Sequence, residues 1–271
     1  MHYQQRLEAE KFATTVTQRI SAVDTDDWFR IKYHLGKGVA GIAAATIALV
    51  EGGAITFRTG GAVPTGVDTI GTAGAIDSSD GAYDTVGKIQ DYINGLGGGW
   101  EMILHGALRS DLMAKAQDKA AASCVGARGL VFYPDSLAAG GATEYYSIAI
   151  TGEHFVDGGT IHDWDEGCVN QLLSFDVTVN MASAGSILIY EGKQGVAETL
   201  VHTLALADNT QLVKHQDYLQ QVYCEAQPGY RLIVRASHAT DIAAAPTEFV
   251  VRGRTIVPTN KHIITASNYA A

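Results

Sequence analysis

The most regular hydrophobic pattern along the chain spans residues 83–96. Asp80, a favourable N-cap residue, precedes it, and glycines at positions 95 and 97–99 mark its end. Its apolar side chains recur every three or four positions, at Tyr83, Val86, Ile89, Ile93 and Leu96. The spacing is that of one face of an α-helix. It predicts a helix that starts near Asp80 and stops at the glycines.

A second helical spacing lies near the N-terminus, within residues 6–23. Its apolar positions are Leu7, Phe12, Val16, Ile20 and Val23. Three aspartates follow, and carboxylates oppose the dipole at a helix C-terminus, so the helix is expected to end near Ala22. Residues 28–35 alternate loosely and predict a short strand. Residues 1–35 are therefore expected to form an arm with one helix, whose apolar face needs a partner because a lone helix of this length is marginal in water.

Residues 46–58 have the pattern of a β-hairpin. For their apolar residues to share one face, Leu49 must oppose Ile55 and Ile47 must oppose Phe57. That register leaves a three-residue loop, Glu51-Gly52-Gly53, with a glycine available for the left-handed position.

The rest of residues 36–140 predicts a small α+β domain. Residues 60–81 are rich in Gly, Thr, Asp and Ser and are expected to be extended loop with short strands. A second, more polar helix is predicted over residues 107–122, with Leu108 and Leu112 on its buried side.

From about residue 143 the pattern changes to short strands separated by turns. Between positions 175 and 181, apolar residues alternate with polar ones, as in a half-buried strand. The predicted strands are 145–151, 172–181, 186–191, 199–206, 219–225, 230–236 and 248–258. Because no helical spacing intervenes, residues 141–271 are predicted to form an antiparallel β-sandwich, jelly-roll-like. The whole chain is thus predicted to be mainly β with a smaller α+β N-terminal part.

The composition excludes some classes of function but indicates no particular reaction. The 271 residues are 46% hydrophobic, which is enough for a sizeable core, and only 18% charged, against a usual ~25%. The formal net charge of −10 argues against a general nucleic-acid or anionic-membrane binder. We therefore expect neither nucleic acid nor membrane as a partner.

The cysteines and the termini give the expected compartment. Cys124, Cys168 and Cys224 are far apart and form no C-x-x-C pair, so we expect buried reduced thiols. The opening MHYQQRLEAEKF has no apolar stretch and does not resemble a signal peptide. The most apolar run, residues 38–50, is shorter than the ~20 residues of a membrane span. The chain is expected to fold in a cytosol.

The segment Gly36–Gly41 has the formal spacing G-x-G-x-x-G of a dinucleotide-binding turn. In such a fold a helix and a strand separate the last glycine from an acidic residue ~20 positions on. Here Glu51 follows after ten residues and lies in the predicted hairpin turn. The segment is therefore interpreted as a glycine-rich turn, and no cofactor is expected.

Residues 154–168 gather histidines, carboxylates and a cysteine, but without any metal-ligand spacing. A solvated loop is the preferred interpretation, and no metal is expected. No G-x-S-x-G occurs, and His202 and His215, in or next to the predicted strands, have no paired carboxylate at a telling spacing. We expect no catalytic residues and classify the chain as not an enzyme.

Four arginines lie in the last two predicted strands, Arg231 with Arg235 and Arg252 with Arg254. Within each pair the spacing is even, so both members lie on one face of a strand. Two interpretations stay open. The pairs form a basic face for an acidic neighbouring subunit, or they pair with carboxylates of their own chain.

The segment Gly74–Asp111, GAIDSSDGAYDTVGKIQDYINGLGGGWEMILHGALRSD, resembles a segment of structural proteins of tailed bacteriophages. The resemblance covers about 38 residues, and the wider character of the chain agrees with it: many Gly, Ala and Thr residues, few cysteines, low charge, the expected N-terminal helical arm and the expected C-terminal β-sandwich. It implies a virion component of the capsid decoration or cement type, assembled in the host cytoplasm. The resemblance implies no active-site residues at any position of this chain.

The leading hypothesis is a non-enzymatic virion structural protein that binds the major capsid protein on the capsid exterior and stabilises the head. A homotrimer is preferred because capsid lattices present threefold positions. The candidate interface residues are Leu7, Phe12, Val16, Ile20, Arg231, Arg235, Arg252 and Arg254. The alternative is a tail-associated or head-fibre protein that binds a host receptor or glycan.

Overall fold

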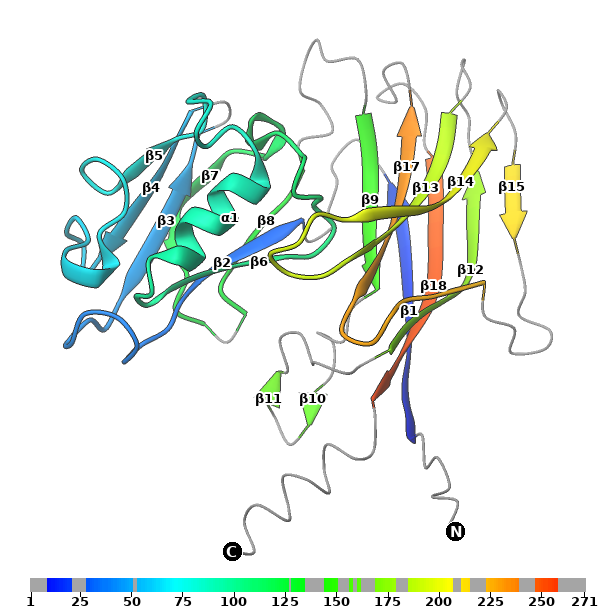
Figure 1. Cartoon of the computed structure of the whole chain (residues 1–271), viewed down its shortest axis with the longest axis horizontal. Coiled ribbons are helices and arrows are strands. Elements are labelled where there is room, and N and C mark those ends of the chain that lie inside the picture. The colour runs from blue at the N-terminus through cyan, green and yellow to red at the C-terminus, as the bar shows by residue number, and fades with distance from the viewer. Residues whose placement is uncertain are drawn as a thin grey trace, which may run out of the picture.

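The computed structural model describes the chain over residues 9–20, 28–50, 53–126, 128–134, 144–150, 156–157, 160–161, 169–178, 185–206, 211–214, 223–238 and 247–257. Figure 1 shows two parts side by side. The N-terminal part comprises residues 28–134. The second part, called the sandwich here, comprises strand β1 (Ala9–Ile20) and the strands after residue 143. The described residues are mainly β, in antiparallel sheets, as the sequence predicts.

Two small sheets and one helix make up the N-terminal part. Its strands are β2 (Phe29–Tyr33), β3 (Ala45–Leu49), β4 (Ala54–Thr59), β5 (Ala75–Asp77), β6 (Trp100–Leu104), β7 (Lys119–Ser123) and β8 (Leu130–Phe132). One sheet has the order β6-β2-β8 and the other β5-β4-β3-β7. The remaining elements are helix α1 (Val86–Gly95) and two 3-10 turns, η1 (Gly66–Asp68) and η2 (Met113–Lys115).

The predicted hairpin register is confirmed. Leu49 lies opposite Ile55 and Ile47 opposite Phe57, and all four side chains are buried. Both strands alternate between buried and half-buried residues, because successive side chains of a strand point to opposite faces. The predicted strand over residues 28–35 is β2, at the centre of its sheet.

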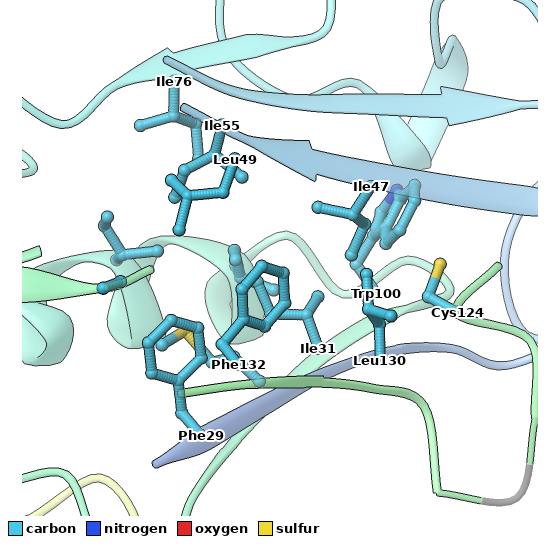
Figure 2. Packing of buried hydrophobic residues seen from close by; sticks show 14 of the residues in the cluster. Phe29, Ile31, Ile47, Leu49, Ile55, Ile76, Trp100, Cys124, Leu130 and Phe132 are labelled. Atoms are coloured by element: carbon cyan, nitrogen blue, oxygen red, sulfur yellow. The ribbon is translucent and has the colours of Figure 1, made fainter. Parts of the chain in front are cut away.

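One hydrophobic core lies between these two sheets and α1 (Figure 2). Phe29 stacks on Phe132 with their ring centroids 4.9 Å apart. The ring of Trp100 meets Tyr33 and Phe57 edge to face, at 4.9 and 5.1 Å. Aromatic pairs in these geometries add to the free energy of burial. The N-terminal part therefore has a complete core of its own.

Helix α1 has the predicted apolar face, with Val86, Ile89 and Ile93 buried. Its N-cap is Thr85, whose hydroxyl accepts from the N–H of Lys88, and not Asp80. The predicted second helix, 107–122, is wrong. The chain there forms a turn, η2 and the edge strand β7, which pairs with β3. Pairing with an existing sheet outweighs the helix propensity of these alanine-rich residues.

The sandwich consists of two antiparallel sheets. Its longer strands are β9 (Glu144–Ile150), β12 (Val169–Thr178), β13 (Gly185–Gly192), β14 (Thr199–Leu206), β15 (Gln211–Lys214), β17 (Arg231–His238) and β18 (Thr247–Val257). One sheet has the order β1-β18-β12-β15 and the other β14-β13-β17-β9. Strand β9 contacts β1, β12 and β18, and β17 contacts β12. The two sheets therefore face each other, as Figure 1 shows.

Most of the strands predicted after residue 143 are present within two or three residues of their predicted ends. Of the segment 219–225, only β16 (Cys224–Glu225) is described as a strand, and residues 219–222 lie outside the described residues. Strand β15 has no counterpart in the prediction. A separate two-stranded ribbon joins β10 (Val156–Asp157) to β11 (Thr160–Ile161).

The predicted N-terminal helix is wrong: residues 9–20 form strand β1, paired with β18 from Ala9 opposite Val257 to Ile20 opposite Thr247. A spacing of four residues cannot separate the two structures. It places residues on one face of a helix, and because four is even, also on one face of a strand. The decisive signal is composition, since Thr, Val and Ile fill this segment and favour strands.

Candidate functional site: the junction between the two parts

The two parts of the chain meet at a polar interface, called the junction here. On the sandwich side it is formed by Gln194, Glu198, Arg231 and Arg235. On the other side lie residues 104–111 of the N-terminal part. Figure 1 shows the loop between β13 and β14 reaching toward α1 and β6. Most contacts at the junction go to main-chain atoms.

Two side-chain amides cap the free edge of β6. Asn94, on α1, accepts from the Met102 N–H at 2.8 Å and donates to the Met102 carbonyl at 3.0 Å. Gln194 repeats this pattern from the sandwich: it accepts from the Leu104 N–H at 3.1 Å and donates to the Leu104 carbonyl at 2.7 Å. Gln90 donates to both Met102 and Gln194. Each amide thus takes the place of a peptide group in a neighbouring strand.

Arg231 is fully buried at the start of β17. Its guanidinium donates to the main-chain carbonyls of His105 and Ala107 and forms an ion pair with Glu198. Burial lowers the pKa of Arg231 to about 10, and the charge of Glu198 opposes that shift. The arginine therefore stays charged at neutral pH. Glu198 is itself buried and also accepts from the Arg109 N–H at 2.9 Å.

Arg235 forms the second ion pair of the junction. Its two terminal nitrogens donate to the two carboxylate oxygens of Asp111 at 2.8 and 2.7 Å, a bidentate geometry. Arg235 also donates to the Gly106 carbonyl at 3.3 Å. Asp111 in turn accepts from the Leu108 N–H at 2.7 Å, which holds the turn that presents it. Both side chains are at most 5% exposed.

Arg231 and Arg235 therefore pair with carboxylates and carbonyls of their own chain, as the second of the two interpretations has it. Arg252 and Arg254 lie in β18, opposite Thr15 and Ala13 of β1. Strand β18 belongs to the other sheet of the sandwich than β17. Of the remaining predicted interface residues, Phe12, Val16 and Ile20 lie in β1, and Leu7 lies outside the described residues.

The glycine-rich segment Gly36–Gly41 has a structural partner. The carboxylate of Asp68 accepts from the Val39 N–H at 2.7 Å and from the Tyr33 hydroxyl at 2.6 Å. A Cβ at Gly38 would lie 2.4 Å from the same carboxylate, so only glycine fits there. The segment binds an internal carboxylate, which agrees with its interpretation as a turn.

Sequence reasoning missed three polar residues of the junction, Asp111, Gln194 and Glu198, and the cap of β6 at Asn94. Each is an ordinary polar residue in a turn, a loop or a helix, and no local spacing marks it. The even spacing of Arg231 and Arg235 is the one signal that points to this interface.

Within the part of the chain that the structure describes, His, Cys, Asp and Glu side chains form no group of three or more suited to a metal ion. Of the 154–168 stretch, only β10 and β11 positions are described; the histidines, Cys168 and the acidic residues 163–166 lie outside the described residues. No described helix is long and apolar enough to cross a membrane.

Comparison with known proteins identifies no family. Neither a protein-family model nor a curated protein sequence matches the chain. A structure of the infectious bursal disease virus Gx strain is 12% identical, over 94% of this chain and 59% of that one, with a TM-score of 0.17. A structure of the Gt strain of the same virus is also 12% identical, over 90% of this chain and 70% of that one, with a TM-score of 0.15. The chain thus spans about three-fifths of the first viral chain. We infer neither fold nor function from TM-scores this low.

Proposed function

We propose that this chain is a non-enzymatic virion structural protein of the capsid decoration or cement type. In this proposal it binds the major capsid protein from outside and holds neighbouring capsid subunits together. A homotrimer is the preferred assembly, because capsid lattices present threefold positions and closed rings satisfy repeated contacts. The resemblance of Gly74–Asp111 to phage structural proteins is one support. The topology of the sandwich is the stronger one.

The observation that carries the proposal is the pairing of the eight longer strands of the sandwich. In chain order they are β1, β9, β12, β13, β14, β15, β17 and β18. The first pairs with the last (β1 with β18), the second with the seventh (β9 with β17), the third with the sixth (β12 with β15) and the fourth with the fifth (β13 with β14). Such nested pairing, rolled into two facing sheets, supports a jelly-roll assignment. Viral capsid domains are among the main users of that architecture.

The same pairing defines how the two parts are connected. The N-terminal part leaves the sandwich after β1 and returns to it before β9. It is therefore an insertion between the first and second strands of the proposed jelly roll. The junction fixes this α-helix-containing insertion against the sandwich through the buried Arg235–Asp111 ion pair and the hydrogen bonds from Arg231 to the carbonyls of His105 and Ala107. An insertion that is held rigidly against the sandwich suits a protein that contacts a capsid lattice at defined points.

The alternative proposal is a tail-associated or head-fibre protein that binds a host receptor or glycan. Jelly rolls also occur in lectins, which supports this reading to the same extent. Tyr190, in β13, is an aromatic residue of a type that binds glycans. Its ring lies 6.0 Å from the Arg235 guanidinium carbon, so it faces the junction. This argues against a glycan site at that residue.

The test is the location of the chain in the particle that encodes it. Antibodies against the purified chain are applied to separated heads and tails, and the mass of the free chain is measured by light scattering. We expect the chain on heads, an oligomer in solution, and rebinding to stripped heads that raises their melting temperature. A chain that is monomeric and found on tails alone overturns the capsid proposal and supports receptor binding.

A further inference from the structure

The last turn of α1 contains Asn94 followed by Gly95, which is the one Asn-Gly pair in the sequence. Asparagine before glycine is especially prone to lose its side-chain amide, because glycine has no Cβ to hinder attack by its own main-chain nitrogen. Asn94 is exposed to solvent. A Cβ added at Gly95 would meet no atom of the described residues within 4 Å. Water can therefore reach both reacting groups.

We propose that Asn94 is a site of spontaneous deamidation in the folded chain. The main-chain nitrogen of Gly95 attacks the side-chain carbonyl carbon of Asn94, and the new C–N bond closes a five-membered succinimide. The bond from that carbon to the side-chain nitrogen breaks, and ammonia leaves with the proton of the Gly95 nitrogen. Water then opens the ring at either carbonyl carbon, which gives aspartate or isoaspartate at position 94. No oxidant or reductant takes part.

The backbone of α1 restrains the first step. Both Asn94 and Gly95 belong to the helix. A helical backbone at an asparagine turns the next main-chain nitrogen out of the plane in which the ring closes. The last turn of α1 must therefore open before the nitrogen can attack. Local opening of this kind costs less free energy at the end of an element than in its middle.

The cap on β6 restrains the same step through the side chain. The Asn94 side-chain oxygen accepts from the Met102 N–H at 2.8 Å, and its nitrogen donates to the Met102 carbonyl at 3.0 Å. Both hydrogen bonds must break before the side chain can turn toward Gly95. The cap thus protects the asparagine that provides it, and the rate of deamidation is the rate in an open chain multiplied by the fraction of molecules that are open.

The products cannot restore the cap. An aspartate at position 94 still accepts from the Met102 N–H, but it has no donor for the Met102 carbonyl. Its charge also lies at the C-terminal end of α1, where it opposes the helix dipole. Isoaspartate adds a methylene group to the main chain inside the last turn. Gln90 keeps its own hydrogen bond to the Met102 carbonyl, so the loss stays local to the end of α1 and the middle of β6.

The test follows the amide in the full-length chain and does not rest on the proposed virion function. The chain is kept in mildly alkaline buffer, with and without guanidinium chloride, and is then cut with trypsin. The peptide between Lys88 and Arg109 contains Asn94 as its one asparagine. Mass spectrometry measures the conversion of amide to acid, and chromatography separates aspartate from isoaspartate. We expect both products in the folded chain, at least about tenfold more slowly than in denaturant, because two hydrogen bonds must first break.

Hydrogen exchange gives an independent measure of the same opening. The Met102 N–H is released when Asn94 lets go of it. The slowing of deamidation by the fold should therefore have the same order of magnitude as the protection of the Met102 amide. Asn94→Asp supplies one product directly, and its Met102 amide should exchange faster than that of the unchanged chain.

Two controls accompany these measurements. Gly95→Ala is the matched variant, since it adds only a Cβ, into open space and at a helical position. It should lose the deamidated peptide over the same period, in denaturant as well as in buffer. Asn170 is the internal control: it is buried and is followed by Gln171, so it should stay intact in the folded chain.

The proposal is overturned if Asn94 converts as fast in the folded chain as in denaturant, because the cap then gives no protection. It is equally overturned if Asn94 stays intact in denaturant, if its conversion in buffer follows global unfolding alone, or if Gly95→Ala converts as fast as the unchanged chain. An Asn94→Asp variant whose Met102 amide exchanges at the unchanged rate contradicts the loss of the cap. None of these outcomes alters the proposed virion function, which is decided by the location of the chain in the particle.

Discussion

The core of the N-terminal part and the junction bury opposite kinds of groups. The core encloses aromatic and aliphatic side chains such as Phe57 and Trp100, and its buried carboxylate, Asp68, is held by N–H and O–H donors. The junction encloses two arginines and two carboxylates, with carbonyl groups as further acceptors. Both are largely closed to water, but one buries apolar surface and the other buries charge.

The core and the junction contribute differently to the stability of the chain and to the orientation of its parts. Burial of apolar area contributes about 25 cal/mol per Å² and has no preferred direction. Buried ion pairs add little net stability, because desolvation offsets the Coulomb attraction, yet removing one partner is costly. The core therefore supplies most of the free energy of folding of the N-terminal part. The junction supplies a single orientation between the two parts.

The largest expected effect is on the core. Phe57→Ala should lower the free energy of unfolding of the N-terminal part by about 3–5 kcal/mol, because it removes a fully buried ring and leaves a cavity. Urea unfolding followed by tryptophan fluorescence, with Trp100 beside the cavity, measures it. Leu35→Ala, at a position that is 51% exposed, is the matched control and should change stability by less than about 0.5 kcal/mol. Equal losses for the two variants would contradict the assigned core.

The next effect is on the junction. Arg231→Met should cost about 3 kcal/mol, because Glu198 is left buried without its cation. The double variant Arg231→Met with Glu198→Leu should recover most of that loss, since no uncompensated charge remains. Urea unfolding of both variants gives the comparison. If the double variant is as unstable as the single one, the pair stabilises the chain directly and the contrast with the core fails.

A smaller effect separates the two amides that cap β6. Asn94→Ala leaves the Met102 N–H without its acceptor, and Gln194→Ala leaves the Leu104 N–H and carbonyl without their partner, at about 1–2 kcal/mol each. Hydrogen exchange measures both at single residues. The Met102 amide should exchange faster in the first variant and the Leu104 amide in the second. The two variants control each other, and acceleration of both amides in either variant would show that β6 opens as a unit.

The smallest effect concerns Cys124 in the N-terminal core. Burial raises the pKa of its thiol from 9.0 to about 12. At pH 8 only about one folded molecule in 10⁴ carries the thiolate, so thiol reagents should label Cys124 only after unfolding. The labelling experiment needs a variant in which Cys168 and Cys224 are replaced by serine, so that Cys124 is the one thiol that can react. Because the folded pKa is raised, stability should fall as the pH rises above 9, where the unfolded chain ionises first. Rapid labelling of the native chain at pH 8 would contradict this.

Sequence reasoning was accurate where a pattern allowed one structure only. The apolar residues of α1 recur at spacings of three and four positions, which do not fall on one face of a strand. The hairpin register followed from the need to bury Ile47 and Phe57 on the same face. It failed where a pattern allowed two. The four-residue spacing in β1 suits a helix and a strand, and the alanines of β7 accept either.

The sequence by itself determined the mainly β character of the chain, the apolar positions of its N-terminal core and most of the strands after residue 143. These depend on local periodicity, which is written in neighbouring residues. The tertiary structure decided that β1 closes the sheet beside β18, more than 200 residues away, and that Arg231 and Arg235 turn inward to Glu198 and Asp111. Those contacts depend on which distant segments the topology brings together. The sequence around a charged residue or an edge strand does not specify its partner, because the partner lies in a distant segment that only the fold brings close.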